Sequence, residues 1–161
     1  MSTALVGQQG QQGDVRFTVN LKAVAKLGEA FAHHGIARYT IPNGFAPFKE
    51  GARMLSLRNV IVPPEPRVKG ETMLARGLAL PGEAFGLLHL LSVVEKDEEI
   101  PVKLQGEVVL VSTDVLVGEG ESGYRYVACA CWRSGCRWWV VEVRWLNQDF
   151  GPDCLIGRFG E

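Results

Sequence analysis

The chain has 161 residues, of which 47% are hydrophobic and 22% charged, and its formal net charge is −1 at neutral pH. This composition is typical of one soluble globular domain and excludes a disordered, collagen-like or coiled-coil protein. The net charge gives no general attraction to nucleic acid or anionic lipid, and the apolar stretches are shorter than the ~18–20 residues of a transmembrane helix.

The N-terminal segment, residues 1–13, is rich in glutamine and glycine. It has too little apolar surface to offset the entropy of ordering it, so we expect an arm that is flexible in the free monomer and can still order against a neighbouring subunit. It lacks the basic start and the apolar run of a secretory signal peptide, and we therefore expect a cytoplasmic protein. The rest of the chain, residues 14–161, is predicted to form a single globular domain.

The first predicted elements are a strand over residues 14–20, where apolar and polar side chains alternate, and a helix over about residues 21–34. Asn20 suits the N-cap of this helix and Gly35 suits its C-terminal end. Apolar residues recur at helical spacing within it, at Leu21, Val24, Leu27 and Phe31.

The middle of the chain predicts shorter elements. Strands are expected over residues 37–41, 54–62 and 71–80. A second helix is predicted over about residues 83–96, with a buried strand as the alternative because glycines interrupt its pattern.

The last third of the chain is predicted to be mainly β-structure. One long strand or two short ones are expected over residues 102–117, then a hairpin over residues 124–145 and a short strand over residues 155–159. Together with the helices, these strands predict an α+β fold whose sheet is mostly antiparallel or forms a partly open barrel.

The predicted hairpin is unusual because residues 124–145 contain all four tryptophans, together with four arginines and one acid. A three-residue loop would pair Trp132 with Cys136, whereas a two- or four-residue loop shifts every pair by one and exchanges the two faces. We prefer the shifted register because it gathers most of the charged side chains on one face. The candidate binding residues on that face are Arg125, Arg133, Trp138 and Arg144.

Three interpretations of this face follow. The tryptophan and the arginine stems can cover a second layer of the fold while the guanidinium groups stay in water. They can form a self-association or protein-binding surface, since tryptophan and arginine are enriched in interface hot spots. They can also bind single-stranded nucleic acid, with bases stacked on tryptophan and phosphates bound by arginine.

Gly118, Gly120 and Gly123 match the glycine pattern of dinucleotide-binding proteins. In those proteins the glycines lead into a helix whose N-terminus faces the phosphates. Here they lead into a predicted strand, and Glu119 and Glu121 would repel phosphate. We therefore expect a flexible hairpin loop.

The four cysteines do not have the usual spacing of a structural zinc site. We expect neutral, packed thiols, with a metal site or a disulfide between Cys131 and Cys136 as alternatives. The cysteines are Cys129, Cys131, Cys136 and Cys154.

The histidines give no metal-binding pattern. His33 and His34 are adjacent, so on a helix they point about 100° apart, and we expect them to interact with the helix C-terminus. His89 lies in an apolar run and is expected in the core or at its boundary. The acidic residues within 95–99 are expected to form a solvated helix end or turn.

The sequence carries no familiar catalytic motif. We therefore expect a non-catalytic binding or assembly module that acts as a homo-oligomer, such as a structural or accessory subunit, for example of a virus. Its partner would be a second copy or another protein, with no membrane and no cofactor. The alternatives are a single-stranded nucleic-acid-binding module that uses the hairpin, and a small cysteine- or metal-dependent enzyme.

Overall fold

The computed structural model describes residues 15–120 and 123–160, and the predicted N-terminal arm lies outside them. One mixed sheet forms the centre of the fold. Its strands are β1 (Val15–Leu21), β3 (Gly51–Arg58), β5 (Glu83–Ala84), β6 (Val109–Val111), β8 (Tyr126–Arg133), β9 (Trp138–Trp145) and β11 (Cys154–Phe159).

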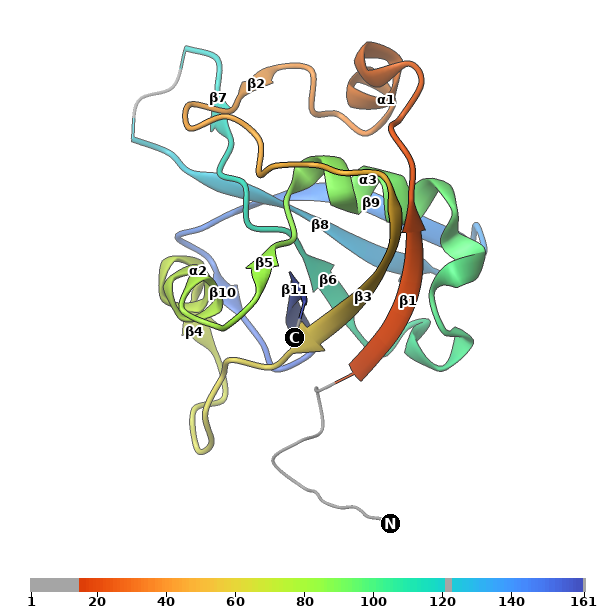
Figure 1. Cartoon of the computed structure of the whole chain (residues 1–161). Coiled ribbons are helices and arrows are strands. Elements are labelled where there is room, and N and C mark those ends of the chain that lie inside the picture. Colours follow the sequence, from red (N-terminus) through yellow and green to blue (C-terminus); the bar gives the residue numbers. More distant parts are fainter. Residues whose placement is uncertain (1–14, 121–122, 161) are drawn as a thin grey trace.

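The strand order in this seven-stranded sheet is β1-β3-β11-β6-β8-β9, and β5 pairs with β11 beside β3. All strand pairs are antiparallel except β6 with β11. Strands β1 and β9 end the sheet without pairing with one another, so the sheet is open (Figure 1). The predicted α+β class with a mostly antiparallel sheet is confirmed.

The remaining elements are short. Two small sheets join β2 (Tyr39–Thr40) to β7 (Val117–Gly118) and β4 (Val68–Lys69) to β10 (Asp149–Phe150). The helices are α1 (Leu27–His33), α2 (Gly70–Leu78) and α3 (Leu87–Glu95), followed by the 3₁₀ turns η2 (Asp97–Glu99) and η3 (Val102–Leu104).

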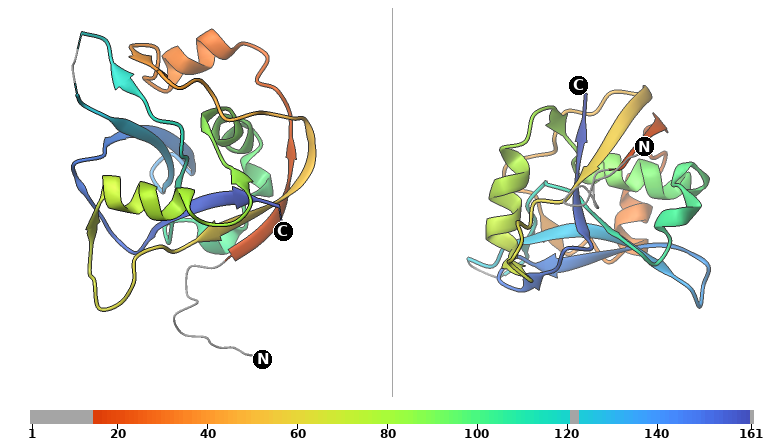
Figure 2. Two further views of the ribbon diagram at one scale, coloured as in Figure 1. Left: turned by 60° about the vertical axis from the view of Figure 1, so that its left-hand side comes forward. Right: turned by 90° about the horizontal axis from the view of Figure 1, so that it is seen from below.

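Helices α2 and α3 lie on opposite sides of β11 (Figure 2). The two core clusters follow this arrangement: Leu155 and Phe159 of β11 face the α3 side, whereas Cys154 and Ile156 face the α2 side. Every residue of β11 is buried. The sheet is therefore covered on both faces at its centre. Among the described residues, no helix combines the length and apolar character needed to cross a membrane.

The helix predicted over residues 21–34 begins only at Leu27. Strand β1 continues through Leu21, which pairs with Gly51 of β3. Asn20, the predicted N-cap, is therefore a strand residue. Pairing with β3 along all of β1 overrides the helical spacing of the side chains, which is a weak preference by comparison.

Tertiary hydrogen bonds hold the segment after β1 in an extended path. The Lys22 backbone N–H donates to Ser92 Oγ at 2.9 Å, and the Ala23 N–H donates to the Glu50 carboxylate at 2.9 Å. At the other end of α1 the prediction is confirmed, because Gly35 has a φ of 72° and ends the helix in the left-handed conformation.

The strand predicted over residues 71–80 is wrong, because this segment is α2. Its buried positions Met73, Leu74 and Gly77 recur at helical spacing and face the sheet. A Cβ atom on Gly77 would lie 2.8 Å from the Ile156 side chain, so glycine is what allows α2 to approach β11.

The second predicted helix is confirmed as α3, although it begins at Leu87 rather than at Glu83. One long strand or two short ones were expected over residues 102–117. The structure has β6 within this range, while β7 begins only at Val117 and the first residues of the range form the turn η3. The hairpin is also confirmed in the preferred register, since Arg133 pairs with Trp138 across a four-residue turn.

Candidate functional site

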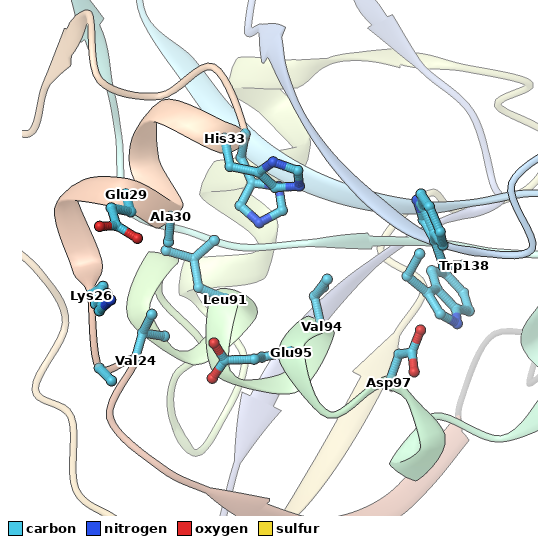
Figure 3. A pocket seen from close by; sticks show the side chains of 13 residues that line it. Val24, Lys26, Glu29, Ala30, His33, Leu91, Val94, Glu95, Asp97 and Trp138 are labelled. Atoms are coloured by element: carbon cyan, nitrogen blue, oxygen red, sulfur yellow. The ribbon is translucent and has the colours of Figure 1, made fainter.

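An open groove of about 780 Å³ lies between α1 and α3 and ends at the first residues of β9 (Figure 3). Its volume falls in the range of ~300–1,000 Å³ that is typical of ligand sites. One wall is a single face of α1 and its N-cap, formed by Lys26, Glu29, Ala30 and His33. The other wall is one face of α3, formed by Leu91, Val94 and Glu95.

The groove exists because α1 packs only partly on the core. None of the residues of α1 is fully buried, whereas α3 has six buried residues. Leu27 and Phe31 are half-buried against the main core cluster and hold α1 in place. Apolar atoms of Val24, Ala25 and Val94 are therefore only partly covered along the groove.

The charged groups along the groove are mainly acidic. They are three carboxylates, from Glu29, Glu95 and Asp97, and one ammonium group, from Lys26. Within the described part of the chain, none of the three carboxylates forms an ion pair. The groove therefore combines an apolar surface with carboxylates that form no ion pair within the described residues.

His33 and His34 also line the groove. Their rings lie 4.8 Å apart in an edge-to-face arrangement. Burial, and then the neighbouring charge of His33, lower the pKa of His34 below its usual range. Across residues 15–120 and 123–160, no three histidine, cysteine, aspartate or glutamate side chains are grouped so that they can hold a metal ion.

Trp138 and Trp139 close the end of the groove at β9. They are successive strand residues and point to opposite faces of the sheet. Trp139 is buried and lies 6.0 Å from Trp132 in an edge-to-face pair, and its Nε1 makes no hydrogen bond with the described residues. Trp138 is 56% exposed, although tryptophan has one of the largest apolar surfaces of any side chain.

The candidate arginines of the hairpin are engaged in ion pairs. Arg125 binds Glu71 at 2.9 Å. Arg133 and Arg144 both bind Glu142, at 3.0 and 2.8 Å. The positive charge that the sequence places on this face is thus largely neutralised by neighbouring carboxylates.

The structure brings three of the four candidate residues near one another. Arg133 and Trp138 face each other at the turn of the hairpin, and Glu142 links Arg133 to Arg144, whereas Arg125 lies at the other end of the hairpin and pairs with Glu71. Nucleic-acid binding through this face stays a prediction, and the geometry gives it no cluster of unpaired arginines.

A second layer covers part of the face that was expected to be outside. Val127 and Cys129 are buried in the cluster under α2. The Arg144 guanidinium lies 5.9 Å from the centre of the Phe150 ring, and its Nη1 lies 3.7 Å from Cys154 Sγ. This part of the hairpin therefore has the structural role that the first interpretation described.

The cysteines are free thiols in different environments. Burial raises the pKa of Cys129 far above its usual range and the pKa of Cys154 to about 11. Burial also raises the pKa of Cys131, while Cys136 is exposed at the turn. Cys131 pairs with Val140 rather than with Cys136, and the structure does not contain the alternative disulfide between Cys131 and Cys136.

The groove unites residues that the sequence singled out separately. His33, His34, Trp138 and the acidic run all reach it, although they lie in three distant parts of the chain. The wall residues Leu91 and Val94 were not identified as site residues, since their helical spacing is equally typical of a buried helix face.

Comparison of the chain with protein-family models, with curated proteins and with solved structures found no match in any of the three.

Proposed function

We propose that this protein is a non-catalytic binding and assembly module that acts as a homo-oligomer, and that it associates through the groove and the adjoining Trp138. The observation that carries this proposal is the position of Trp138, a largely exposed tryptophan at the edge of an apolar groove. Tryptophan is enriched among interface hot-spot residues, and an exposed indole beside apolar surface suits that role.

The energetics support association at this place. Removing apolar surface from water contributes roughly 25 cal/mol per Å². A tryptophan on the rim of a concave apolar surface can bury its ring completely against a partner, as interface hot-spot residues do. Neighbouring charges such as Glu95 and Asp97 then restrict which partner fits.

The thiols support a non-catalytic role. A cysteine nucleophile acts as the thiolate, which a depressed pKa favours. Burial instead raises the pKa of Cys154 to about 11, and the pKa of Cys129 is also raised. Both thiols are protonated at neutral pH and contribute to packing.

Sedimentation velocity over a range of protein concentrations tests the proposal. We expect the wild-type chain to form a defined oligomer, and Trp138→Ala to shift the equilibrium towards the monomer by at least about tenfold. Tyr124→Ala is the matched control, because Tyr124 is an aromatic residue of the same hairpin with a similar exposure of 50% and lies outside the groove.

A wild-type chain that remains monomeric at submillimolar concentration contradicts the proposal. The same conclusion follows if Trp138→Ala and Tyr124→Ala weaken association equally, because the groove would then have no special part in it.

A further inference from the structure

The turn of the hairpin between β8 and β9 extends beyond the neighbouring elements (Figure 2). Its residues, Ser134 to Arg137, are all exposed. Within the described residues Arg137 forms no ion pair, in contrast to Arg133. The turn thus presents an exposed arginine at the residue before the exposed Trp138.

Arg137 also has a backbone conformation that favours glycine. Its φ is 65°, and it is the one residue other than glycine with a positive φ in the described part of the chain. This left-handed conformation is unfavourable for a residue that has a Cβ atom. Residues held in such conformations cluster at functional sites.

The groove beside this turn has the opposite charge. Asp97 and Trp138 both line the groove at its β9 end, and Glu95 lies further along the α3 wall (Figure 3). The turn that carries Arg137 therefore leads directly into a residue of the groove, Trp138, which shares that lining with two carboxylates. A surface that contains both halves of a complementary contact is suited to a two-fold dimer, in which the same patch of both chains is used.

We propose that the hairpin turn of each chain docks in the acidic end of the groove of a second copy, so that Arg137 of one chain pairs with Asp97 of the other. The two-fold axis passes near Trp138, and the two indole rings cover each other there. This inference rests on the proposed function, because it requires that the chain associates with itself.

Reciprocal charge reversal tests the docking. A two-fold dimer contains the contact between residues 137 and 97 two times, once in each direction. Arg137→Glu alone makes both contacts acid against acid, and Asp97→Arg alone makes both contacts base against base. We expect each single variant to dimerise at least about tenfold more weakly than the wild type, since like charges meet at both contacts. When the two variants are mixed, both contacts become attractive, and we expect heterodimers with an affinity close to that of the wild type.

Two matched controls separate this contact from a general charge effect. Glu98→Lys reverses an exposed acid next to Asp97 that lies outside the groove, and Arg16→Glu reverses an exposed arginine on β1. We expect both to dimerise as the wild type does. Arg137→Gly relieves the backbone conformation, so we expect it to unfold at a higher denaturant concentration while it dimerises more weakly.

Sedimentation equilibrium of the variants, alone and mixed, gives three outcomes. Recovery on mixing supports the docking. A wild-type dimer whose affinity neither charge reversal changes overturns the docking and leaves the proposed function in place. A wild-type chain that does not associate overturns both.

Discussion

The carboxylate of Asp114 occupies the position that a side chain on Gly86 would need. A Cβ atom on residue 86 would overlap the Asp114 carboxylate, which accepts hydrogen bonds from the Leu87 N–H at 2.9 Å and from the Ala46 N–H at 3.1 Å. Asp114 thereby fixes both the first turn of α3 and the loop before β3. Because α3 forms one wall of the groove, this contact positions the candidate site.

Gly86→Ala is expected to lower the free energy of unfolding by about 1–3 kcal/mol, since the added methyl group must displace the Asp114 carboxylate. Gly28→Ala is the matched control on α1, where a Cβ atom meets nothing within 4 Å, and it should raise the free energy of unfolding by up to about 1 kcal/mol. Urea unfolding of both variants measures the difference. Equal effects of the two substitutions would show that the fit at Gly86 has no energetic importance.

Asp114→Ala should destabilise the fold by about 1–3 kcal/mol, because the Leu87 and Ala46 N–H groups lose their acceptor. Asp114→Asn keeps an oxygen acceptor without the charge, and its loss should be smaller. Thermal unfolding of the two variants tests this order, which a larger loss for Asp114→Asn would contradict.

His89 makes the stability of the protein depend on pH. Burial lowers its pKa from 6.5 to about 4, and the Gly86 N–H donates to its Nδ1 at 2.9 Å, which requires an unprotonated nitrogen there. The unfolded chain therefore binds a proton at this residue between pH 6.5 and about 4, while the folded chain does not. His89 accordingly contributes its full stability above pH 6.5, and this contribution is lost as the pH falls towards 4, by at most about 3 kcal/mol.

The variant His89→Gln separates this effect from other titrating groups, since glutamine also provides a hydrogen-bond acceptor but does not titrate. Its stability at pH 8 measures the cost of altered packing. Between pH 6.5 and 4 it should lose less stability than the wild type does, as urea unfolding at each pH would reveal. Parallel pH profiles of the two proteins would exclude His89 as the cause.

The four thiols should react with alkylating reagents at different rates, because they are buried to different extents. Iodoacetamide is expected to modify Cys136 first, because it is exposed at the turn of the hairpin, while Cys129 and Cys154 react only after unfolding. Peptide mass spectrometry over the time course identifies the order. Rapid modification of Cys154 in the folded protein would instead favour the enzyme hypothesis.

The register of the hairpin could be predicted because charged side chains gather on one of its faces and apolar side chains on the other. A shift of β9 by one residue against β8 would move the buried Trp139 to the exposed face of the hairpin. The same shift would divide the charged side chains between the two faces, and this was sufficient to reject it from the sequence. Helix α2 could not be predicted in the same way. Its packing residue Gly77 is recognisable only when Ile156, distant in the chain, is known to lie against it.

The groove could be predicted only in parts, for a related reason. Its histidines and Trp138 are notable residue types, but nothing in the sequence says that α1 stays half-buried above α3. That position depends on hydrogen bonds such as the one from Lys22 to Ser92, which joins residues far apart in the chain. The spacing of apolar residues predicts single helices and strands, but it does not predict hydrogen bonds between residues that are far apart in the chain.

The place of β11 in the sheet constrains how the protein is made. This strand follows every other strand in the chain, yet it lies between β3 and β6. While the chain is being synthesised, the two halves of the sheet, β1-β3 and β6-β8-β9, have no strand to join them until residues 154–159 have left the ribosome. Final folding is then dominated by long-range pairing, which is slow compared with local contacts. A nascent chain halted before β11 would expose apolar surface from both core clusters, and such surface promotes aggregation.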